Sequence, residues 1–369
     1  MIVVGEHTKL AQRKKRAMSR MILGFHGLLP PDELRSWLKE YTPAGFILFG
    51  RNVEQQEQVW ECNQKLYKLC GMNEPPILSV DQEGGRVRRI KDTNWPPMRM
   101  LGHLDDLKWT EKIIRGINQE IKDLGFNANW APCADVDSNP DNPVIGDRSF
   151  GRYPELCAKH VQKSIEVMHA MNMIACAKHF PGHGDTDLDS HLDLPTVNKE
   201  RRDIENCELI PFQKAVEAGI EIIMTAHVIF PSFDEENPAT MSKKILTGQL
   251  REKMGYQGLI VSDDMEMKAV RGRYPLELQL DRSIRAGVDL FLMCSEQELQ
   301  EKAFEIMVHL QEQDPEHDRL AEASSTRLHR LRANFLQAPP SHTPFLDRIG
   351  AEEYQQMAAW VRERGEGSV

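Results

Sequence analysis

Short apolar runs recur along the chain, and longer stretches of mixed polarity separate them. Eight of these runs are bounded by Gly, Pro or Asp, and they cover residues 21–25, 45–49, 77–80, 126–136, 173–177, 220–226, 259–261 and 288–293. A short continuous apolar run is typical of a strand that is buried on both faces of a parallel sheet. The pattern therefore predicts eight parallel strands.

Helical periodicity fills most of the intervals between these runs. It covers residues 54–70, 109–124, 155–171, 200–218 and 276–286. The Pro-Pro and Gly breaks fall mostly between the elements, as expected for loop residues. Eight strand–helix repeats favour a closed barrel over an open sheet. We therefore predict an α/β fold, a (β/α)8 TIM barrel that forms a single domain over residues 1–335.

The periodicity fades after about Arg332. A linker-like stretch rich in Pro, residues 337–344, follows, and a short helix is predicted over residues 352–364. We interpret residues 336–369 as a C-terminal extension that packs on the barrel or contacts a partner, and not as a second domain.

The charge and the cysteine content narrow the class of protein. The formal net charge is −10, which disfavours binding to nucleic acid or to an anionic membrane surface. The basic patch at Arg13–Arg16 precedes an apolar run of only five residues, whereas a secretory signal needs about 7 to 15. The seven scattered cysteines do not suggest a disulfide framework. We expect a cytoplasmic protein that acts as a monomer and binds neither nucleic acid nor membrane.

Polar residues stand at or just after the ends of several apolar runs. They are Asp81, Lys178, His179, His227 and Asp263. In a (β/α)8 barrel the carboxyl ends of all strands meet at one face, and this face carries the chemistry. Five such residues at equivalent places therefore predict an active site at that face.

The segment from Lys178 to His191 concentrates three Asp and three His after a predicted strand. A polar surface loop is one interpretation. A calcium loop is another, because Asp185, Asp187 and Asp189 have suitable spacing, but Ser190 and Thr196 stand where Gly and Glu are needed. The His-x-His and His-Glu-x-x-His zinc signatures are absent from the sequence. We predict neither a metal nor a cofactor.

A second polar segment, Val261-Ser-Asp-Asp264, ends another predicted strand. Adjacent side chains of a strand point in different directions. We therefore expect only Asp263 to face the mouth of the barrel, while Asp264 caps the next helix.

These segments together resemble the signature blocks of glycoside hydrolase family 3. The blocks are residues 81–87, 146–151, 178–191 and 261–264, and the resemblance covers residues 18–335. It is strongest with the β-N-acetylglucosaminidases (β-N-acetylhexosaminidases), which include the bacterial enzyme of cell-wall recycling. The resemblance implies that residues 1–335 form a catalytic (β/α)8 domain.

The resemblance also implies a role for each matching residue. Asp263 corresponds to the nucleophile, and His191, held by Asp189, to the acid/base. The residues that match sugar-binding positions are Asp81, Arg148, Lys178 and His179, and Arg86 and His227 also line the mouth by position. A His can replace the usual acid/base carboxylate because its pKa lies near working pH, at about 6.5. Such a His needs an anion to fix its tautomer, as in other Asp–His pairs.

The implied activity is the release of terminal β-linked N-acetylglucosamine from a small carbohydrate, a GlcNAc-containing muropeptide or a disaccharide. A phosphorylase that shares the glycosyl-enzyme is an alternative, because a His acid/base would not repel phosphate. A β-glucosidase of the same family, a metal-dependent amidohydrolase and an inert sugar-binding barrel are the others. The segment Asp264-Met-Glu-Met-Lys268 departs from the family pattern on the leaving-group side, so the leaving group stays open.

Overall fold

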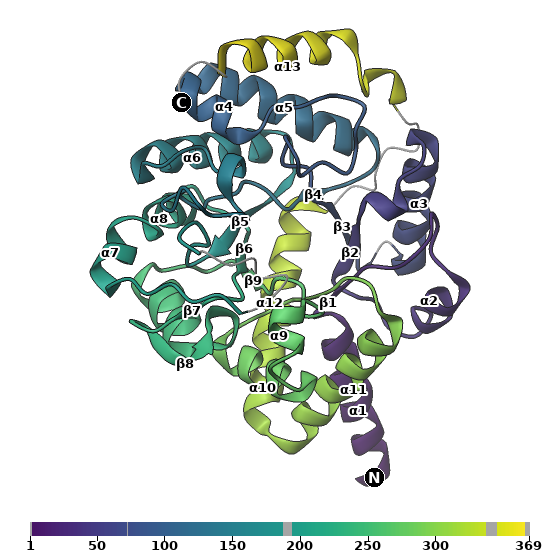
Figure 1. The fold of residues 1–369 in the computed structure, drawn as a ribbon. Helices are drawn as coiled ribbons and strands as arrows, with labels where there is room; N and C mark the ends of the chain where they lie inside the picture. Colours follow the sequence, from purple (N-terminus) through teal and green to yellow (C-terminus); the bar gives the residue numbers. More distant parts are fainter. Residues whose placement is uncertain (1, 72, 187–193, 337–344, 366–369) are drawn as a thin grey trace.

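Eight parallel strands follow one another around a ring (Figure 1). The computed structural model describes residues 2–71, 73–186, 194–336 and 345–365. The strands of the ring are β1 (Met21–Leu23), β2 (Gly45–Leu48), β3 (Ile77–Val80), β4 (Ala128–Asn129), β5 (Ile174–Phe180), β6 (Ile222–Thr225), β9 (Leu259–Val261) and β10 (Phe291–Met293). They pair in the order β10-β1-β2-β3-β4-β5-β6-β9, and a parallel bridge between Val261 and Leu290 joins the two ends. The predicted (β/α)8 barrel is confirmed.

Helices surround the ring, and most of them connect successive strands. The predicted ones are α3 (Gln56–Cys70), α5 (Leu107–Asp123), α6 (Pro154–Ala170), α7 (Arg201–Asn206), α8 (Leu209–Glu217), α10 (Leu276–Ala286) and α13 (Glu352–Gly365). The others are α1 (Ile2–Met18), α2 (Asp32–Trp37), α4 (Met98–Leu104), α9 (Lys268–Arg271), α11 (Gln297–Gln313) and α12 (Pro315–Phe335). The predicted helix over 200–218 is divided at Cys207, where the backbone leaves the helical region.

Short elements complete the chain on the carboxyl-end face and between helices. They are the hairpin of β7 (Ile229–Phe230) and β8 (Asp234–Pro238), the 3-10 turns η1 (Gly50–Asn52), η2 (Gly146–Arg148), η3 (Ala239–Met241) and η5 (Leu346–Arg348), and the π-helix η4 (Lys244–Lys253). No helix in the described part of the chain is long and apolar enough to cross a membrane.

The strand predicted over 126–136 forms a regular ladder only in β4. Pro132 has no amide hydrogen to donate to a ladder. The chain nevertheless stays beside β5, because Cys176 donates to the carbonyl of Ala131 and Ala134 to that of Lys178. The run therefore lies beside β5 as far as Ala134, although only two of its residues form strand.

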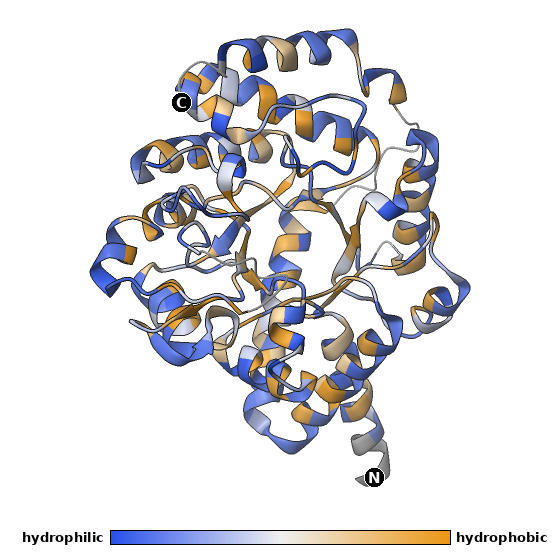
Figure 2. Ribbon diagram, viewed as in Figure 1, coloured by the Kyte–Doolittle hydropathy of each residue, from blue (hydrophilic) through white to orange (hydrophobic). Residues whose placement is uncertain are grey.

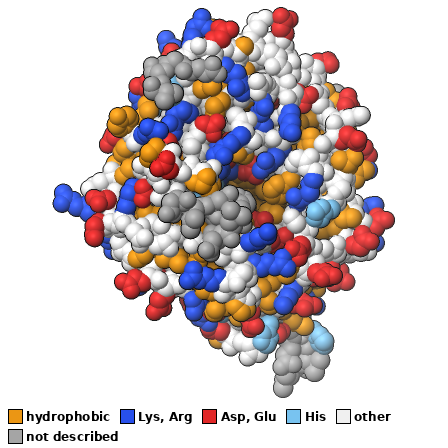
Figure 3. Space-filling model, in the orientation of Figure 1, with side chains coloured by type: hydrophobic (Ala, Val, Ile, Leu, Met, Phe, Trp, Pro, Cys, Tyr) orange, Lys and Arg blue, Asp and Glu red, His pale blue; other side chains and the backbone are white. Residues whose placement is uncertain are grey.

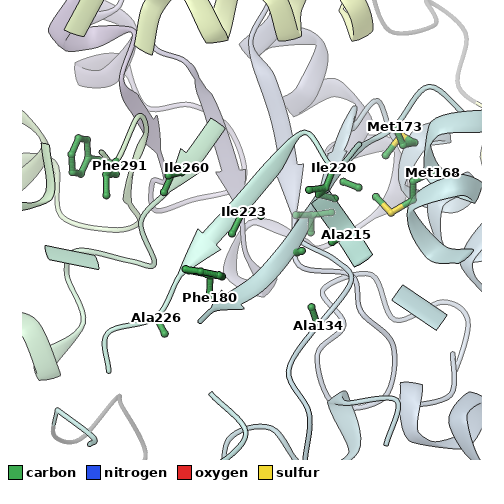
Figure 4. Close-up of a cluster of buried hydrophobic side chains, with 14 of the residues drawn as sticks. Ala134, Met168, Met173, Phe180, Ala215, Ile220, Ile223, Ala226, Ile260 and Phe291 are labelled. Carbon is green, nitrogen blue, oxygen red and sulfur yellow. The ribbon is translucent and has the colours of Figure 1, made fainter. Parts of the chain in front are cut away.

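Alternate residues of the strands enter two different apolar clusters. In β9, Leu259 and Val261 belong to the cluster inside the ring, whereas Ile260 belongs to the cluster between the ring and the helices. This alternation follows from the pleat of a strand. Figure 4 shows part of the outer cluster, where Phe180, Ile223 and Ile260 lie together. Figure 2 shows hydrophobic and hydrophilic residues interspersed along the covering helices, and buried apolar residues of these helices belong to the outer cluster.

Helix α12 covers the amino ends of the strands. Its residues Leu328 and Leu331 join the inner cluster, and Arg332 donates to the carbonyls of Pro43 and Pro75, just before β2 and β3. In Figure 1 this helix crosses behind the ring. The amino ends are therefore closed, and the carboxyl ends are open.

Candidate active site

A cavity of about 590 Å³ opens at the carboxyl ends of the strands. Figure 3 shows this face, with apolar side chains in a central hollow and Lys and Arg side chains around it. The charged and His residues that line the cavity are Asp81, Arg89, Arg148, Lys178, His179, His183, Asp263, Asp264, Glu266 and Lys268. Phe49, Trp130 and Cys294 are among the other lining residues. Most of the predicted site residues are therefore gathered here from distant parts of the chain.

A buried ion network forms one wall. Lys178 Nζ lies 2.6 Å from Asp81 Oδ1 and 2.7 Å from Glu83 Oε1, and Arg148 holds the same Glu83 through two bonds of 2.8 and 2.9 Å. Burial alone would raise the pKa of Glu83, but Arg148 and Lys178 outweigh it and lower this pKa. Burial likewise opposes protonation of Lys178, but Asp81 and Glu83 raise its pKa. Glu83, Arg148 and Lys178 therefore stay charged near neutral pH. The network presents fixed donors and acceptors to a polyhydroxylated ligand.

Arg89, which the sequence did not single out, faces the cavity in place of Arg86. Arg89 donates to Asp81 Oδ2 at 3.4 Å and its guanidinium lies 5.6 Å from the centre of the Phe49 ring. Arg86 instead donates to the backbone carbonyls of Pro143 and Ile145, each at 3.2 Å. The sequence alone does not show which of the two arginines faces the cavity. The path of the turn that follows β3 decides this.

His179 is oriented by a buried carboxylate. Its Nδ1 lies 2.8 Å from Asp135 Oδ2, and its amide donates to both oxygens of Asp135 at 3.1 Å. The amide of His183 donates to the same carboxylate at 2.7 Å. Lys178 and His179 both line the cavity although they are neighbours, since the register of β5 against β6 shifts between Ala177 and Phe180.

The segment after β5 is anchored to the loop that follows β4. The Asn142 amide donates to the carbonyls of His183 and Thr186, both at 2.9 Å, and its oxygen accepts from the amides of Val144 and Ile145. Burial lowers the pKa of His183 to about 4, so this ring is neutral at pH 7. The predicted acid/base residues Asp189 and His191 lie outside the described residues.

Asp263 follows β9 at the floor of the cavity. Burial opposes its ionisation, but His179, His227 and Lys178, together with the amide of Asp264, lower its pKa. His227 does not line the cavity: it is buried behind Asp263, with Nε2 3.1 Å from the carbonyl of Asp264. A carboxylate that stays ionised in a largely enclosed site suits nucleophilic attack.

The expectation that Asp264 caps a helix is wrong. Helix α9 begins at Lys268 with Met267 at its N-cap, and the side chain of Asp264 lines the cavity beside Glu266. Its Oδ1 accepts from the amide of Glu266 at 3.1 Å. The alternation of a strand no longer applies, because β9 has ended at Val261. Both carboxylates therefore face the cavity.

The described residues contain no group of three or more His, Cys, Asp or Glu side chains placed to hold a metal ion. The chemistry of the described site thus comes from Asp263, the ion network and the oriented His179. Such a site can hold a neutral, hydroxyl-rich molecule and attack it with a carboxylate. The fold and the site define a barrel enzyme of the glycosidase class.

Comparison with known proteins gives the family. The model described as the glycosyl hydrolase family 3 N terminal domain matches residues 12–331. A β-hexosaminidase from Nitrosomonas eutropha is 36% identical over 300 residues, which cover 79% of this chain and 84% of that protein. The chain belongs to glycosyl hydrolase family 3, as its signature blocks predicted, and it is a glycosidase.

Solved structures agree with this family. A family 3 β-N-acetylglucosaminidase from Paenibacillus sp. FPU-7 has a TM-score of 0.90 and 32% identity, over 95% of this chain and 68% of that one. NagZ from Neisseria gonorrhoeae, in complex with N-trifluoroacetyl-D-glucosamine, has a TM-score of 0.74 and 25% identity, over 94% of this chain and 98% of that one.

Proposed function

We propose that the chain is a retaining β-N-acetylglucosaminidase that releases terminal β-linked N-acetylglucosamine. The observation that carries the proposal is Asp263, a carboxylate with a lowered pKa at the floor of the cavity. The relatives support the sugar: they are β-hexosaminidases, and NagZ binds an N-acylglucosamine. In this proposal Asp81, Arg148, Lys178 and His179 bind the sugar hydroxyls, and Arg89 joins them.

The reaction has two steps. In the first, an oxygen of Asp263 attacks the anomeric carbon, the bond to the leaving oxygen breaks, and His191 gives that oxygen its proton. In the second, His191 takes a proton from water, the water oxygen attacks the anomeric carbon, and the Asp263 carboxylate is released. Asp189 supports the charged form of His191. His227 and Arg86 act indirectly: His227 lies behind the nucleophile, and Arg86 donates to carbonyls of the neighbouring loop that carries Arg148.

For the natural substrate we propose a GlcNAc-containing muropeptide of peptidoglycan recycling, with the enzyme acting in the cytoplasm. NagZ is among the similar structures, and the seven cysteines are free thiols, which suits a reducing compartment. Glu266, Met267 and Lys268 line the cavity, so the segment that departs from the family pattern would contact the leaving group. We place the catalytic domain at residues 1–335 and the extension at 336–369.

The first experiment compares aryl β-glycosides of N-acetylglucosamine and glucose, each with and without phosphate. We expect fast release from the N-acetylglucosaminide alone, unaffected by phosphate, with the β-anomer formed first in an NMR time course. Sugar 1-phosphate as product would establish the phosphorylase instead. Release of α product first would exclude the covalent intermediate.

A second experiment tests the nucleophile. Asp263→Gly should lower kcat by at least about 10³-fold, since covalent catalysis is lost. Azide added to this variant should restore turnover and give the α-glycosyl azide, because the small anion enters the space of the missing carboxylate. Near-normal activity of Asp263→Gly, or a β-glycosyl azide, would contradict the assignment.

A further inference from the structure

The loop between β3 and α4 has two limbs that lie against each other. The inner limb, residues 81–89, carries Asp81, Glu83 and Arg89. The outer limb, residues 92–97, lies away from the cavity, and its residues do not line it. The amide of Gly85 donates to the carbonyl of Trp95 at 3.0 Å, so one limb is hydrogen-bonded to the other next to Glu83.

The two limbs touch too closely to move separately. Gly84 has a φ of 105°, and a Cβ on it would lie 2.4 Å from the carbonyl oxygen of Pro96. Arg88 crosses between the limbs, since its Nη1 donates to the carbonyl of Thr93 at 3.1 Å and to Asn94 Oδ1 at 2.6 Å. A displacement of the outer limb would therefore displace the inner one.

The C-terminal helix holds the outer limb directly. Arg362 on α13 donates to the carbonyl of Asn94 at 3.0 Å, to Asn94 Oδ1 at 2.9 Å and to the carbonyl of Trp95 at 2.8 Å. Gln355, two turns earlier, donates to the carbonyl of Asp92 at 2.7 Å. Three of these four bonds are to backbone carbonyls of the limb, so they fix its path.

A buried carboxylate of α5 joins the same parts. Glu120 accepts from Trp95 Nε1 at 2.7 Å, from the Thr93 hydroxyl, and from the amide of Gly350 at 2.8 Å. Gly350 lies between η5 and α13. Glu120 is fully buried, and an unsatisfied carboxylate there would be costly. The side chain of Glu120 thus links the outer limb to the C-terminal segment.

The helix itself is firmly attached to the barrel. The rings of Trp360 and Trp109 are stacked with their centres 3.8 Å apart, and Gly365 packs against Met100 of α4. Figure 1 shows α13 lying along the outer side of α4 and α5. This segment also lies beyond residue 331, where the match to the family model ends.

We propose that residues 346–365 are a brace that fixes the outer limb and thereby positions Asp81 and Arg89 for sugar binding. The residues that Arg362 holds, Asn94 and Trp95, do not line the cavity, so Arg362 is a positioning residue and not a catalytic one. The inference rests on the proposed function only for the sugar-binding role of the inner limb. The mechanical link from Arg362 to Gly85 stands on the hydrogen bonds alone.

Hydrogen exchange tests the link without any substrate. In Arg362→Ala, the amides of residues 83–95 should exchange about tenfold faster, with Gly85 among them, because the bonds that hold the outer limb are lost. The matched control is Arg364→Ala, which removes the same charge from the same helix. Arg364 lies over the Trp360 ring and pairs with Glu363, away from the limb. Unchanged exchange in Arg362→Ala, or an equal change in both variants, would overturn the brace.

Kinetics with an aryl N-acetylglucosaminide test the consequence. Arg362→Ala should raise KM by about threefold to tenfold and change kcat by less than about twofold, because binding and not chemistry is affected. Arg362→Lys should restore part of the loss, and Arg364→Ala should match the wild type. A fall in kcat at constant KM would overturn the positioning role. An inactive wild type with the expected exchange response would overturn the proposed function and uphold the brace.

Discussion

The side chain of Asp135 is hydrogen-bonded to two histidines of the site, His179 and His183. It is fully buried, and it accepts from the ring and amide of His179 and from the amide of His183. A carboxylate on Nδ1 fixes the tautomer of a His, so the other nitrogen of His179 is the one available to a substrate. The orientation of His179, which lines the cavity, therefore depends on Asp135, which does not line it.

Asp135→Asn should lower kcat/KM by about 10- to 100-fold, because the isosteric amide can no longer support the same tautomer of His179. The ratio is measured with an activated aryl glycoside, whose leaving group needs no proton. Asp137→Asn, on the same loop and paired with Arg99, is the control. A loss of the same size in the control would argue against a specific role of Asp135.

Asp135 should also make the folding stability depend on pH in the acidic range. Burial opposes its ionisation, but His179 and His183 outweigh it and lower its pKa from 3.8 to about 2. A lowered pKa stabilises the folded state above pH 4, and this gain is lost as the pH falls through 2. Between pH 4 and pH 2, the free energy of unfolding of the wild type should fall by about 2 kcal/mol relative to that of Asp135→Asn. Urea unfolding at a series of pH values measures it, and a constant difference would contradict the prediction.

Asp264 should have the opposite effect. Burial, with Glu266 and Asp263 nearby, raises its pKa from 3.8 to about 7. A raised pKa gives stability that is complete below pH 4 and is lost as the pH rises through 7. The free energy of unfolding of Asp264→Asn, relative to that of the wild type, should therefore rise by roughly 3 kcal/mol between pH 4 and pH 8. Chemical unfolding at both pH values provides the comparison, and equal differences at the two would refute this pKa.

Among the loops and helices, the contact between the loop after β4 and the segment after β5 matters most for the chemistry. Asn142 joins them by bonds to both, and it is almost fully buried. The second segment leads to Asp189 and His191 in the sequence. Asn142 therefore holds the residues that immediately precede the proposed acid/base segment in the sequence.

Asn142→Ala should cost about 2 to 3 kcal/mol of stability, because buried carbonyls of His183 and Thr186 lose their donor. Its kcat should fall more for poor leaving groups than for activated ones, since the proton transfer that we propose for His191 matters most there. Asn139→Ala, on the same loop, removes only a bond to the amide of Asp141 and is the control. Equal losses across leaving groups would separate Asn142 from the acid/base segment.

The elements differ in how far the sequence predicts them. Seven of the eight strands lie within their predicted runs, because a strand buried on both faces needs a continuous apolar segment. Strand β5 continues beyond its run, which ended at Ala177, through Lys178 and His179 to Phe180. Helices α1, α11 and α12 were not predicted. Helices α1 and α12 are rich in charged residues, and they pack mainly against other helices. Tertiary packing stabilises such helices more than their own periodicity does.

The surface of the whole molecule bears on its state of association. Of the residues that the structure describes, Tyr153 and Phe345 are the large hydrophobic side chains that are exposed, at 73% and 47%. A stable dimer normally needs a larger apolar patch than two separate residues provide. We expect analytical ultracentrifugation to give a single species of 42.3 kDa. A species of twice this mass that persists on dilution would contradict this.

The sequence by itself determined the ring of strands and the position of Asp263, Asp81, Lys178 and His179 at its carboxyl end. Both follow from local patterns, an apolar run and the polar residue that ends it. Only the tertiary structure decided that Arg89 and not Arg86 enters the cavity, that Asp264 lines it together with Asp263, and that α13 holds the loop after β3. These depend on turns and on contacts between distant segments, and no local period in a sequence records which distant side chains will meet.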